Sequence, residues 1–273
     1  MPRSGSSPIS NAMPEPLPLS VLLLARDEAA RLDRLLPALD FAREVVVVVD
    51  RASRDGTREV AARHGARVFE RALDGFGRQR RFALEQCRES WVLWIDADER
   101  LDARARRALA EAVASSAAAG YRFARRTWFL GRPIRFCGWR GEKVTRLFRR
   151  DRARFDEAPI HERVEVQGTV LDLPGVIEHS SYESWTACRD KLVRYAAAGA
   201  ARARKRGKSA GPLDLVLRPA LRFLRMYVFQ LGFLDGVHGL ALCLLAAAQV
   251  FLKYAELWAD RGAEAQGGDP PSP

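Results

Sequence analysis

The residues best suited to chemistry in this chain are acidic residues that follow apolar runs. The run 91–95 leads directly into Asp96, Ala97, Asp98 and Glu99, so two carboxylates are spaced as Asp-x-Asp. Both can reach past a strand end, where oxygen ligands suit Mg²⁺ or Mn²⁺ and the ion can neutralise a diphosphate leaving group. The same spacing also occurs in acidic loops, so a solvated turn with Asp102 as the next helix cap is the structural alternative.

Two earlier apolar runs end in the same way. Residues 44–50 are rich in valine and close on Asp50, and residues 19–25 are followed by Arg26, Asp27 and Glu28. Such runs predict strands that are covered on both faces. Ligands bind at the carboxyl ends of the strands in open parallel α/β sheets. We therefore expect one ligand site at the ends of three buried strands.

Helical and strand periods alternate around these runs. Leucines at helical spacing follow the first run, and Gly65 and Gly120 each stop a helix. The expected elements are a helix near 32–39, a helix from 57 to 65 with Asp55 as its cap, a strand at 66–70, and helices near 78–88 and 102–119. This alternation predicts a largely parallel sheet with right-handed crossovers. The first run is not followed by Gly-x-Gly-x-x-Gly, which argues against a dinucleotide site.

From residue 121 the sequence becomes rich in predicted strands, at 121–128, 143–148 and 163–166. Aromatic and basic residues alternate there, a pattern also found in proteins that bind nucleic acid. The aromatic residues serve equally well as core residues or as a platform for a sugar ring; they are Trp128, Phe136, Trp139 and Phe148. We expect no nucleic-acid partner.

The C-terminal quarter contains a predicted amphipathic helix with a basic flank. Its apolar stripe is Leu217, Leu221, Leu224, Val228 and Leu231, beside Arg218, Arg222 and Arg225. This pattern is typical of a helix on an anionic membrane surface, and a helix packed on the protein is the alternative. The stretch 236–252 has no charged residue but falls short of the roughly 20 residues that span a bilayer, so we expect an interfacial or hairpin helix. The basic cluster 202–208 can meet acidic headgroups or a phosphorylated acceptor.

Composition fits an anionic partner. The net charge is +11 and the isoelectric point is near 10.1, which suits nucleotide sugars, phosphorylated glycans or lipid headgroups. The four cysteines have no close pair, which favours reduced, buried thiols in a cytoplasmic protein. Residues 1–18 and 262–273 are rich in proline, glycine and polar residues, so we expect disordered tails and find no apolar secretory signal in the first of them.

The ordered motifs of residues 19–101 resemble the nucleotide-binding half of inverting family 2 glycosyltransferases. Residues 50–57 read D-R-A-S-R-D-G-T, Arg80-Arg81 correspond to the family's R-N, and 96–99 read D-A-D-E. The later motifs resemble the branch that contains lipopolysaccharide-core β-1,4-glucosyltransferases; they are L-G-R at 130–132, G-W at 138–139, R-L-F-R-R at 146–150 and H-E-R at 161–163. The resemblance extends over about residues 19–260.

This resemblance implies a GT-A-like α/β fold, related to the Rossmann fold, with a mixed but mainly parallel sheet and a C-terminal amphipathic helical appendage. The expected parts are a nucleotide-sugar-binding half at 19–120, an acceptor-binding half at 121–185, and a helical, membrane-associating region at 186–261.

The resemblance also assigns roles to residues. Asp98 is expected to hold the divalent cation, while Asp96 shares it or contacts the ribose, and Asp50 lies at the nucleobase and ribose. Glu162 is the expected general base and His161 orients it or touches the metal. The competitors for the base are Asp156, Glu157 and Glu142. Further donor contacts are expected from Asp27, Arg80, Arg81 and Arg146, with Arg149 as a second arginine able to contact phosphate.

Two positions depart from the family pattern. Asp27 and Arg81 stand where asparagine is usual, and their charges are opposite. We therefore expect the two side chains to pair across the donor pocket, because a matched pair can replace two hydrogen-bonded amides.

These features predict a metal-dependent inverting glycosyltransferase, which moves a hexose from a nucleotide sugar, with UDP expected, to a lipopolysaccharide-core or other lipid-linked glycan. It is expected at the cytoplasmic face of the bacterial inner membrane. The alternatives are a sugar-phosphate nucleotidyltransferase, although the glycine-rich loop and lysine of that class do not follow the first strand, and a non-catalytic membrane- or polyanion-binding protein.

Overall fold

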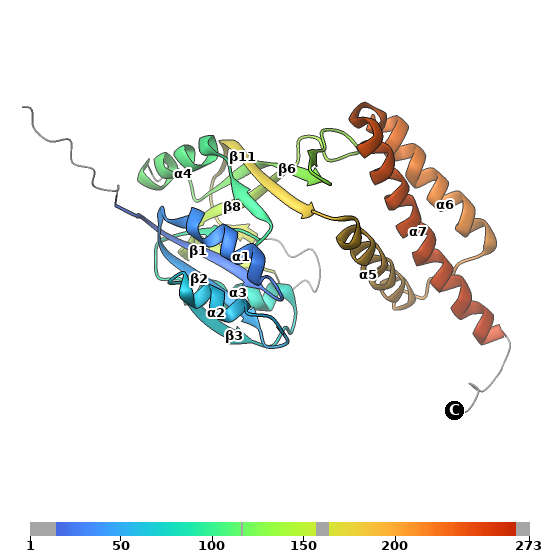
Figure 1. Cartoon of the computed structure of the whole chain (residues 1–273), viewed down its shortest axis with the longest axis horizontal. Coiled ribbons are helices and arrows are strands. Elements are labelled where there is room, and N and C mark those ends of the chain that lie inside the picture. Colours follow the sequence, from blue (N-terminus) through green and yellow to red (C-terminus); the bar gives the residue numbers. More distant parts are fainter. Residues whose placement is uncertain (1–14, 116, 157–163, 266–273) are drawn as a thin grey trace, which may run out of the picture. The chain divides into compact units, whose positions relative to one another are not determined.

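The structure is a computed structural model that describes residues 15–115, 117–156 and 164–265 (Figure 1). The chain forms two compact units, which are described separately. The first contains Met1–Phe123 and Thr145–Gly175, and the second contains Ala124–Val144 and Val176–Pro273. The segment 145–175 therefore belongs with the first 123 residues, and not with a separate half that begins near residue 121.

Four parallel strands form the centre of the first unit. They are β1 (Leu17–Ala25), β2 (Ala42–Asp50), β3 (Arg67–Arg71) and β4 (Trp91–Trp94). Strand β1 lies between β2 and β4, and β3 lies outside β2. Valines 46–48 of β2 and Leu22 of β1 are completely buried, which explains the continuous apolar runs in their sequences. The expected parallel α/β sheet is confirmed.

The sheet continues through strands that run against β4. β8 (Lys143–Arg149) is antiparallel to β4, and the order within the described residues is β3-β2-β1-β4-β8-β6-β11-β5, with β7 beside β6. The further strands are β6 (Gly120–Phe129), β11 (Val170–Tyr182), β5 (Glu99–Leu101) and β7 (Arg132–Pro133), and a separate small sheet pairs β9 (Ala153–Phe155) with β10 (Val164–Val166). This mixed, mainly parallel architecture is the GT-A-like one that the sequence predicts.

Helices connect the parallel strands. They are α1 (Ala29–Leu35) with the 3-10 turn η1 (Leu36–Leu39), α2 (Thr57–Arg63), α3 (Phe76–Gln86) and α4 (Ala103–Ser115), and the turn η2 (Arg150–Arg152) follows β8. The start of α2 at Thr57 and the positive φ of 77° at Gly65 agree with the prediction. Strand β1 begins two residues earlier than expected, at Leu17, and α4 ends earlier than expected, at Ser115.

Three long helices dominate the second unit. They are α5 (Trp185–Arg204), α6 (Pro212–Leu224) and α7 (Gly236–Ala265), and the turns η3 (Arg225–Phe229) and η4 (Gly232–Asp235) join α6 to α7. Figure 1 shows α6 and α7 side by side in orange and red, and both α5 and α6 pack against α7. Their core includes the thiols of Cys137 and Cys243, whose sulfur atoms are 3.8 Å apart. All four cysteines are buried and reduced, as predicted.

Helix α7 corrects the prediction for residues 236–252. It has 30 residues, because the helix continues beyond the uncharged stretch. Among the described residues, Gly232–Asp260 is a candidate membrane span by length and composition, and only 17% of its most apolar window is buried. Core helices of soluble proteins can have the same length and apolar composition.

Gly175 lets the backbone of β11 approach α4, and its replacement gives a test of this packing. Its φ is 99°, and a Cβ atom there would lie 2.2 Å from the Ala105 nitrogen and 2.5 Å from the Ala105 Cα. We expect Gly175→Ala to lower the free energy of unfolding by about 3 kcal/mol, from backbone strain and overpacking together. Urea denaturation followed by circular dichroism measures the change.

Gly131→Ala is the matched control. Gly131 also has a positive φ, of 80°, but a Cβ atom there would meet no described atom within 4 Å. It should cost only the strain, about 1 kcal/mol. Equal losses in the two variants would contradict the close approach of β11 to α4.

Candidate functional site

The carboxyl ends of β1, β2 and β4 lie at one edge of the first unit. Ala25 is paired with Val49 across β1 and β2, and Leu22 is paired with Trp94 across β1 and β4. This register brings the residues that follow each strand to the same edge. Asp50 ends β2, the loop 26–28 follows β1, and the Asp-x-Asp segment follows β4, as the sequence predicts.

Asp96 lies between two arginines. Its Oδ1 atom accepts a hydrogen bond from Arg80 Nη1 at 3.3 Å, and its Oδ2 atom accepts one from Arg146 Nη2 at 2.9 Å. The indole Nε1 of Trp94 also donates to Oδ1, at 3.3 Å. Burial raises the pKa of Asp96, but the charges of Arg146 and Arg80 outweigh it and hold that pKa well below its usual range. Asp96 is therefore ionised at physiological pH.

Glu99 contacts both Arg146 and the backbone of Asp96. It is completely buried, accepts Arg146 Nη2 at 2.6 Å through one oxygen, and accepts the Asp96 backbone N–H at 3.1 Å through the other. The guanidinium carbons of Arg80 and Arg146 each lie 4.0 Å from the Trp94 ring centroid, a cation–π distance. We call Arg80, Trp94, Asp96, Glu99 and Arg146 the Asp96 cluster; its two positive and two negative charges cancel.

The Asp96 cluster distinguishes the two members of Asp-x-Asp as metal ligands. Both oxygens of Asp96 are engaged by protein donors, whereas Asp98 is a partly buried carboxylate of the same loop. Within the described ranges, no three His, Cys, Asp or Glu residues gather as a metal cage. Mg²⁺ is commonly held by one or two carboxylates together with substrate phosphates. A carboxylate of this loop together with substrate phosphates would fit that arrangement, and the role of Asp98 as ligand stays a prediction.

Asp50 is held where the resemblance places a nucleobase and ribose contact. It is 6% exposed, and its Oδ1 atom accepts the backbone N–H groups of Ala52 at 3.1 Å and Leu73 at 3.4 Å. Arg26 Nη1 lies 3.4 Å from Oδ2. These contacts fix the carboxylate at the sheet edge; its role toward a ligand stays a prediction.

The Ser-x-Asp-Gly-Thr motif ties two edge loops together. Asp55 accepts the backbone N–H groups of Ala29 and Thr57, each at 3.0 Å. Burial raises the pKa of Asp55, but the hydrogen bonds from Thr57 and Ala29 outweigh it and lower that pKa. Asp55 thus satisfies the first helical N–H groups of α1 and α2, which is the capping role expected from the sequence.

The expected pairing of Asp27 with Arg81 is wrong. Asp27 has a φ of 53° and accepts the Arg54 backbone N–H at 2.7 Å, while its own N–H donates to Ser53 Oγ at 3.0 Å. Arg81 instead donates to the Phe155 carbonyl oxygen at 3.2 Å. The two side chains have different partners because α3 directs Arg81 toward β9 and away from the loop after β1.

The candidates for the general base are only partly described. His161, Glu162 and Glu157 lie outside the described residues, while Asp156 is described and partly buried. Glu142 belongs to the second unit, where it makes a bidentate pair with Arg125 at 2.7 and 3.1 Å. Arg149 lies 3.6 Å from Asp151, so Arg146 is the arginine of the R-L-F-R-R motif that reaches the edge carboxylates.

Glu99 and Trp94 contact the expected site residues, and the sequence did not indicate either of them. Both residues lie close to the Asp-x-Asp segment in the sequence. The sequence alone does not distinguish Glu99 from an exposed acidic residue. Only the structure shows that Arg146, 47 positions away, enters the core between Asp96 and Glu99. A burial that depends on a distant partner leaves no local pattern.

Loss of the Glu99 charge should destabilise the first unit. In Glu99→Gln the shape is retained, but Arg146, which is 3% exposed, faces one carboxylate instead of two. Breaking a buried ion pair by removing one partner typically costs about 3–5 kcal/mol, and we expect about 3 kcal/mol here. Urea denaturation measures the loss.

Glu142→Gln provides the comparison, because its pair with Arg125 is partly exposed. Such pairs contribute under about 1 kcal/mol. A Glu99→Gln loss no larger than that of Glu142→Gln would show that Glu99 does not stabilise the Asp96 cluster.

Known proteins resemble this chain over most of its length. LpsC of Rhizobium meliloti (strain 1021), a lipopolysaccharide core biosynthesis glycosyltransferase, is 30% identical over 254 residues, which cover 88% of this chain and 94% of LpsC. The uncharacterized glycosyltransferase RP128 of Rickettsia prowazekii (strain Madrid E) is 26% identical over 253 residues, which cover 88% of this chain and 86% of RP128.

Solved structures give a weaker likeness. Residues 1–349 of S. aureus TarS match with a TM-score of 0.42 and 14% identity over 92% of each chain. Glucosyl-3-phosphoglycerate synthase from Mycobacterium tuberculosis, solved with Mn²⁺, UDP and glucosyl-3-phosphoglycerate, matches with a TM-score of 0.35 and 19% identity, over 49% of this chain and 57% of that one. These low TM-scores carry no argument about the site.

The family match identifies the chain. Residues 20–164 match Glycosyl transferase family 2, a range that takes in more than half of the chain and all five residues of the Asp96 cluster. The match and the similarity to LpsC confirm the family that the motifs indicate. The chain belongs to glycosyltransferase family 2 and is a glycosyltransferase.

Proposed function

We propose that this enzyme transfers a hexose, with inversion, from a nucleotide sugar to a lipopolysaccharide-core or other lipid-linked glycan. UDP is the expected nucleotide. The name and coverage of LpsC support the acceptor class, because 94% of that protein is matched. The edge formed by Asp50, Asp96 and Asp98 supports a nucleotide-sugar site, since ligands of parallel α/β sheets bind at that edge.

The single observation that carries the mechanism is the charge balance of the Asp96 cluster. Arg80 and Arg146 are each paired with Asp96, and Arg146 also with Glu99, so their charges are already compensated. A departing diphosphate needs positive charge at the moment that the glycosidic bond breaks. A divalent cation held by Asp98 would supply that charge. The protein's own part is to keep Asp96 ionised and fixed beside Asp98 for contact with the ribose.

The acceptor hydroxyl must lose its proton to a base on the face opposite the leaving group. We propose Glu162 for this role, with His161 orienting it. Asp156 and Glu157 are the nearby alternatives in sequence. This assignment rests on the resemblance, because a Glu-Asp pair follows the Leu-Phe-Arg strand in the wider family and His161-Glu162 stands at the corresponding place in this sequence.

The sugar-phosphate nucleotidyltransferase alternative has no support in the family match.

The test of the proposed function is a panel of sugar donors. Thermal unfolding is measured with UDP-, GDP- and ADP-sugars, each with and without Mn²⁺, and transfer to a core glycolipid is followed by mass spectrometry. A donor that stabilises the protein only with Mn²⁺ and supports transfer confirms the proposal. If the rate of sugar transfer is the same with and without excess EDTA, the reaction does not depend on a divalent cation and that part of the proposal is wrong.

Asp98→Asn tests the proposed ligand directly. The variant keeps size but loses the carboxylate charge, so turnover should fall by about 10²–10³, the scale for removing a principal electrostatic stabiliser. Stability should change little, because Asp98 is only partly buried.

Asp102→Asn is the control for this variant. Asp102 accepts the Ala105 N–H at 2.7 Å as the cap of α4, and asparagine caps helices equally well, so turnover and stability should both be retained. Near-normal turnover in Asp98→Asn would remove Asp98 from the metal site.

We also propose that the second unit binds the cytoplasmic face of the inner membrane through α6 and η3. Exposed apolar residues follow one another there: Leu217 at 54%, Leu221 at 62% and Phe229 at 79%. Arg218, Arg222 and Arg225 are exposed beside them. An apolar stripe flanked by arginines suits an anionic bilayer surface.

Replacing Leu217, Leu221 and Leu224 together by serine should weaken binding to anionic vesicles by on the order of 10²-fold, since full burial of one leucine contributes about 2 kcal/mol and these three, roughly half exposed, would together contribute about 3 kcal/mol. Sedimentation with vesicles measures it, and added salt should weaken the wild-type protein further. The control replaces Leu73 and Leu171 of the first unit, which are 40% and 44% exposed. Equal sedimentation of the two variants would show that the stripe does not enter lipid.

A further inference from the structure

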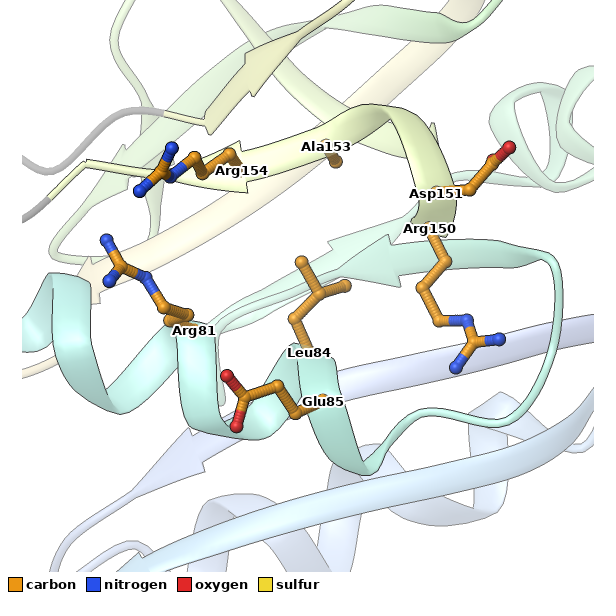
Figure 2. Close-up of a pocket in the computed structure, with 7 residues that line it drawn as sticks. All are labelled: Arg81, Leu84, Glu85, Arg150, Asp151, Ala153 and Arg154. Carbon is orange, nitrogen blue, oxygen red and sulfur yellow. The ribbon is translucent and has the colours of Figure 1, made fainter.

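A pocket of about 370 Å³ lies beside the Asp96 cluster in the first unit. It is bounded by α3, the turn η2 and β9 (Figure 2), and its lining residues are Arg81, Leu84, Glu85, Arg150, Asp151, Ala153 and Arg154. Its volume is within the range of about 300–1,000 Å³ typical of small-molecule sites. Three arginines in one small pocket are the feature that needs explanation.

The pocket and the Asp96 cluster share a wall. On α3, Arg80 contacts Asp96, and the next residue, Arg81, lines the pocket. On β9, the Phe155 ring packs against Trp94 with centroids 5.2 Å apart, and the preceding residue, Arg154, lines the pocket. Each element thus presents one residue to the cluster and its neighbour to the pocket. A ligand in the pocket would lie next to the site of sugar transfer.

The arginines are arranged to meet an anion. Figure 2 shows Arg81 from α3 and Arg154 from β9 extending toward the same end of the pocket, with Arg150 at the other end. Backbone carbonyls orient two of them, because Arg81 donates to the Phe155 oxygen at 3.2 Å and Arg150 donates to the Cys87 oxygen at 2.8 Å. Guanidinium groups fixed in this way match the planar oxygens of phosphate or carboxylate.

Two carboxylates also line the pocket, and they do not cancel this charge. Asp151 lies 3.6 Å from Arg149 and 3.7 Å from Arg152, two arginines outside the lining. Glu85 is exposed and lies one helical turn after Arg81 on α3. It should weaken an anion's binding, so its removal should have the opposite effect from removal of an arginine.

We infer that this pocket binds an oxyanion substituent, phosphate or carboxylate, on a sugar of the acceptor glycan. The inference rests on the proposed function, because that function makes the ligand next to the donor edge a glycan. Arg154 and Arg81 hold the oxyanion at their end of the pocket, and Arg150 adds positive charge from the other end. The pocket thereby selects acceptors that carry a charged group at a fixed distance from the reacting hydroxyl.

The test measures binding without turnover. Core oligosaccharide is released by mild acid from the glycolipid of cells that lack this gene, and it is titrated into the full-length protein by isothermal calorimetry. Arg154→Gln should weaken binding about tenfold, the scale of one charge-assisted hydrogen bond, and Arg150→Gln should weaken it by less. Glu85→Gln should tighten it. Arg88→Gln, an exposed arginine just after α3 and outside the lining, should bind like the wild type.

Two modified oligosaccharides identify the anion. One is dephosphorylated with hydrogen fluoride and the other has its carboxylates reduced. The oligosaccharide that has lost the recognised group should bind the wild-type protein about tenfold more weakly than the unmodified one. It should bind the wild type and Arg154→Gln with equal affinity. The inference is overturned if the wild type binds none of these oligosaccharides, if both arginine variants bind like Arg88→Gln, or if their defect persists with both modified forms.

A transfer assay separates this inference from the proposed function. If the wild-type enzyme glycosylates the intact glycolipid and the Arg154→Gln and Arg150→Gln variants have the same acceptor KM as the wild type, the proposed function stands and the anion pocket is overturned. A protein that binds the oligosaccharide through these arginines, but transfers no sugar from any donor, retains the pocket and loses the function.

Discussion

The ionic contact of Arg146 with Asp96 and Glu99 is the constraint around which the first unit is built. An arginine that is 3% exposed is tolerable only when its charge is matched, and the two carboxylates match it at 2.9 and 2.6 Å. Arg146 enters on β8, which pairs with β4, so the contact also fixes the antiparallel strand against the parallel ones. The loop after β4 is held rigid as a result.

That rigidity gives chemical meaning to a short acidic motif. Asp96 is fixed by three protein donors, and Asp98, which follows it in the same loop, is the ligand that we propose for a cation. Electrostatic stabilisation of a leaving group is most effective when the groups that provide it need not reorganise. The Asp96 cluster satisfies that condition through fixed hydrogen bonds and through the Trp94 ring that packs against both guanidinium groups.

The sequence predicted local features well and distant ones poorly. The buried strands, the cap at Asp55 and the helix end at Gly65 depend on neighbouring residues, and the structure confirms them. The pairing of Asp27 with Arg81 failed because side-chain direction depends on the packing of α3 against β9. The uncharged stretch 236–252 underestimated the length of α7, because charged residues such as Lys253 interrupt an apolar run without ending the helix. The roles of Glu162 and His161 remain predictions.

The end of α7 has a consequence for any contact with lipid. Arg204 of α5 lies 2.9 Å from Glu256 and 2.5 Å from Asp260 of α7, so these charges join two helices of the second unit at one level. Lowering that level into hydrocarbon would bury three charged groups at once, which is costly. If the second unit binds a bilayer as proposed, this ion pair between α5 and α7 opposes deeper insertion.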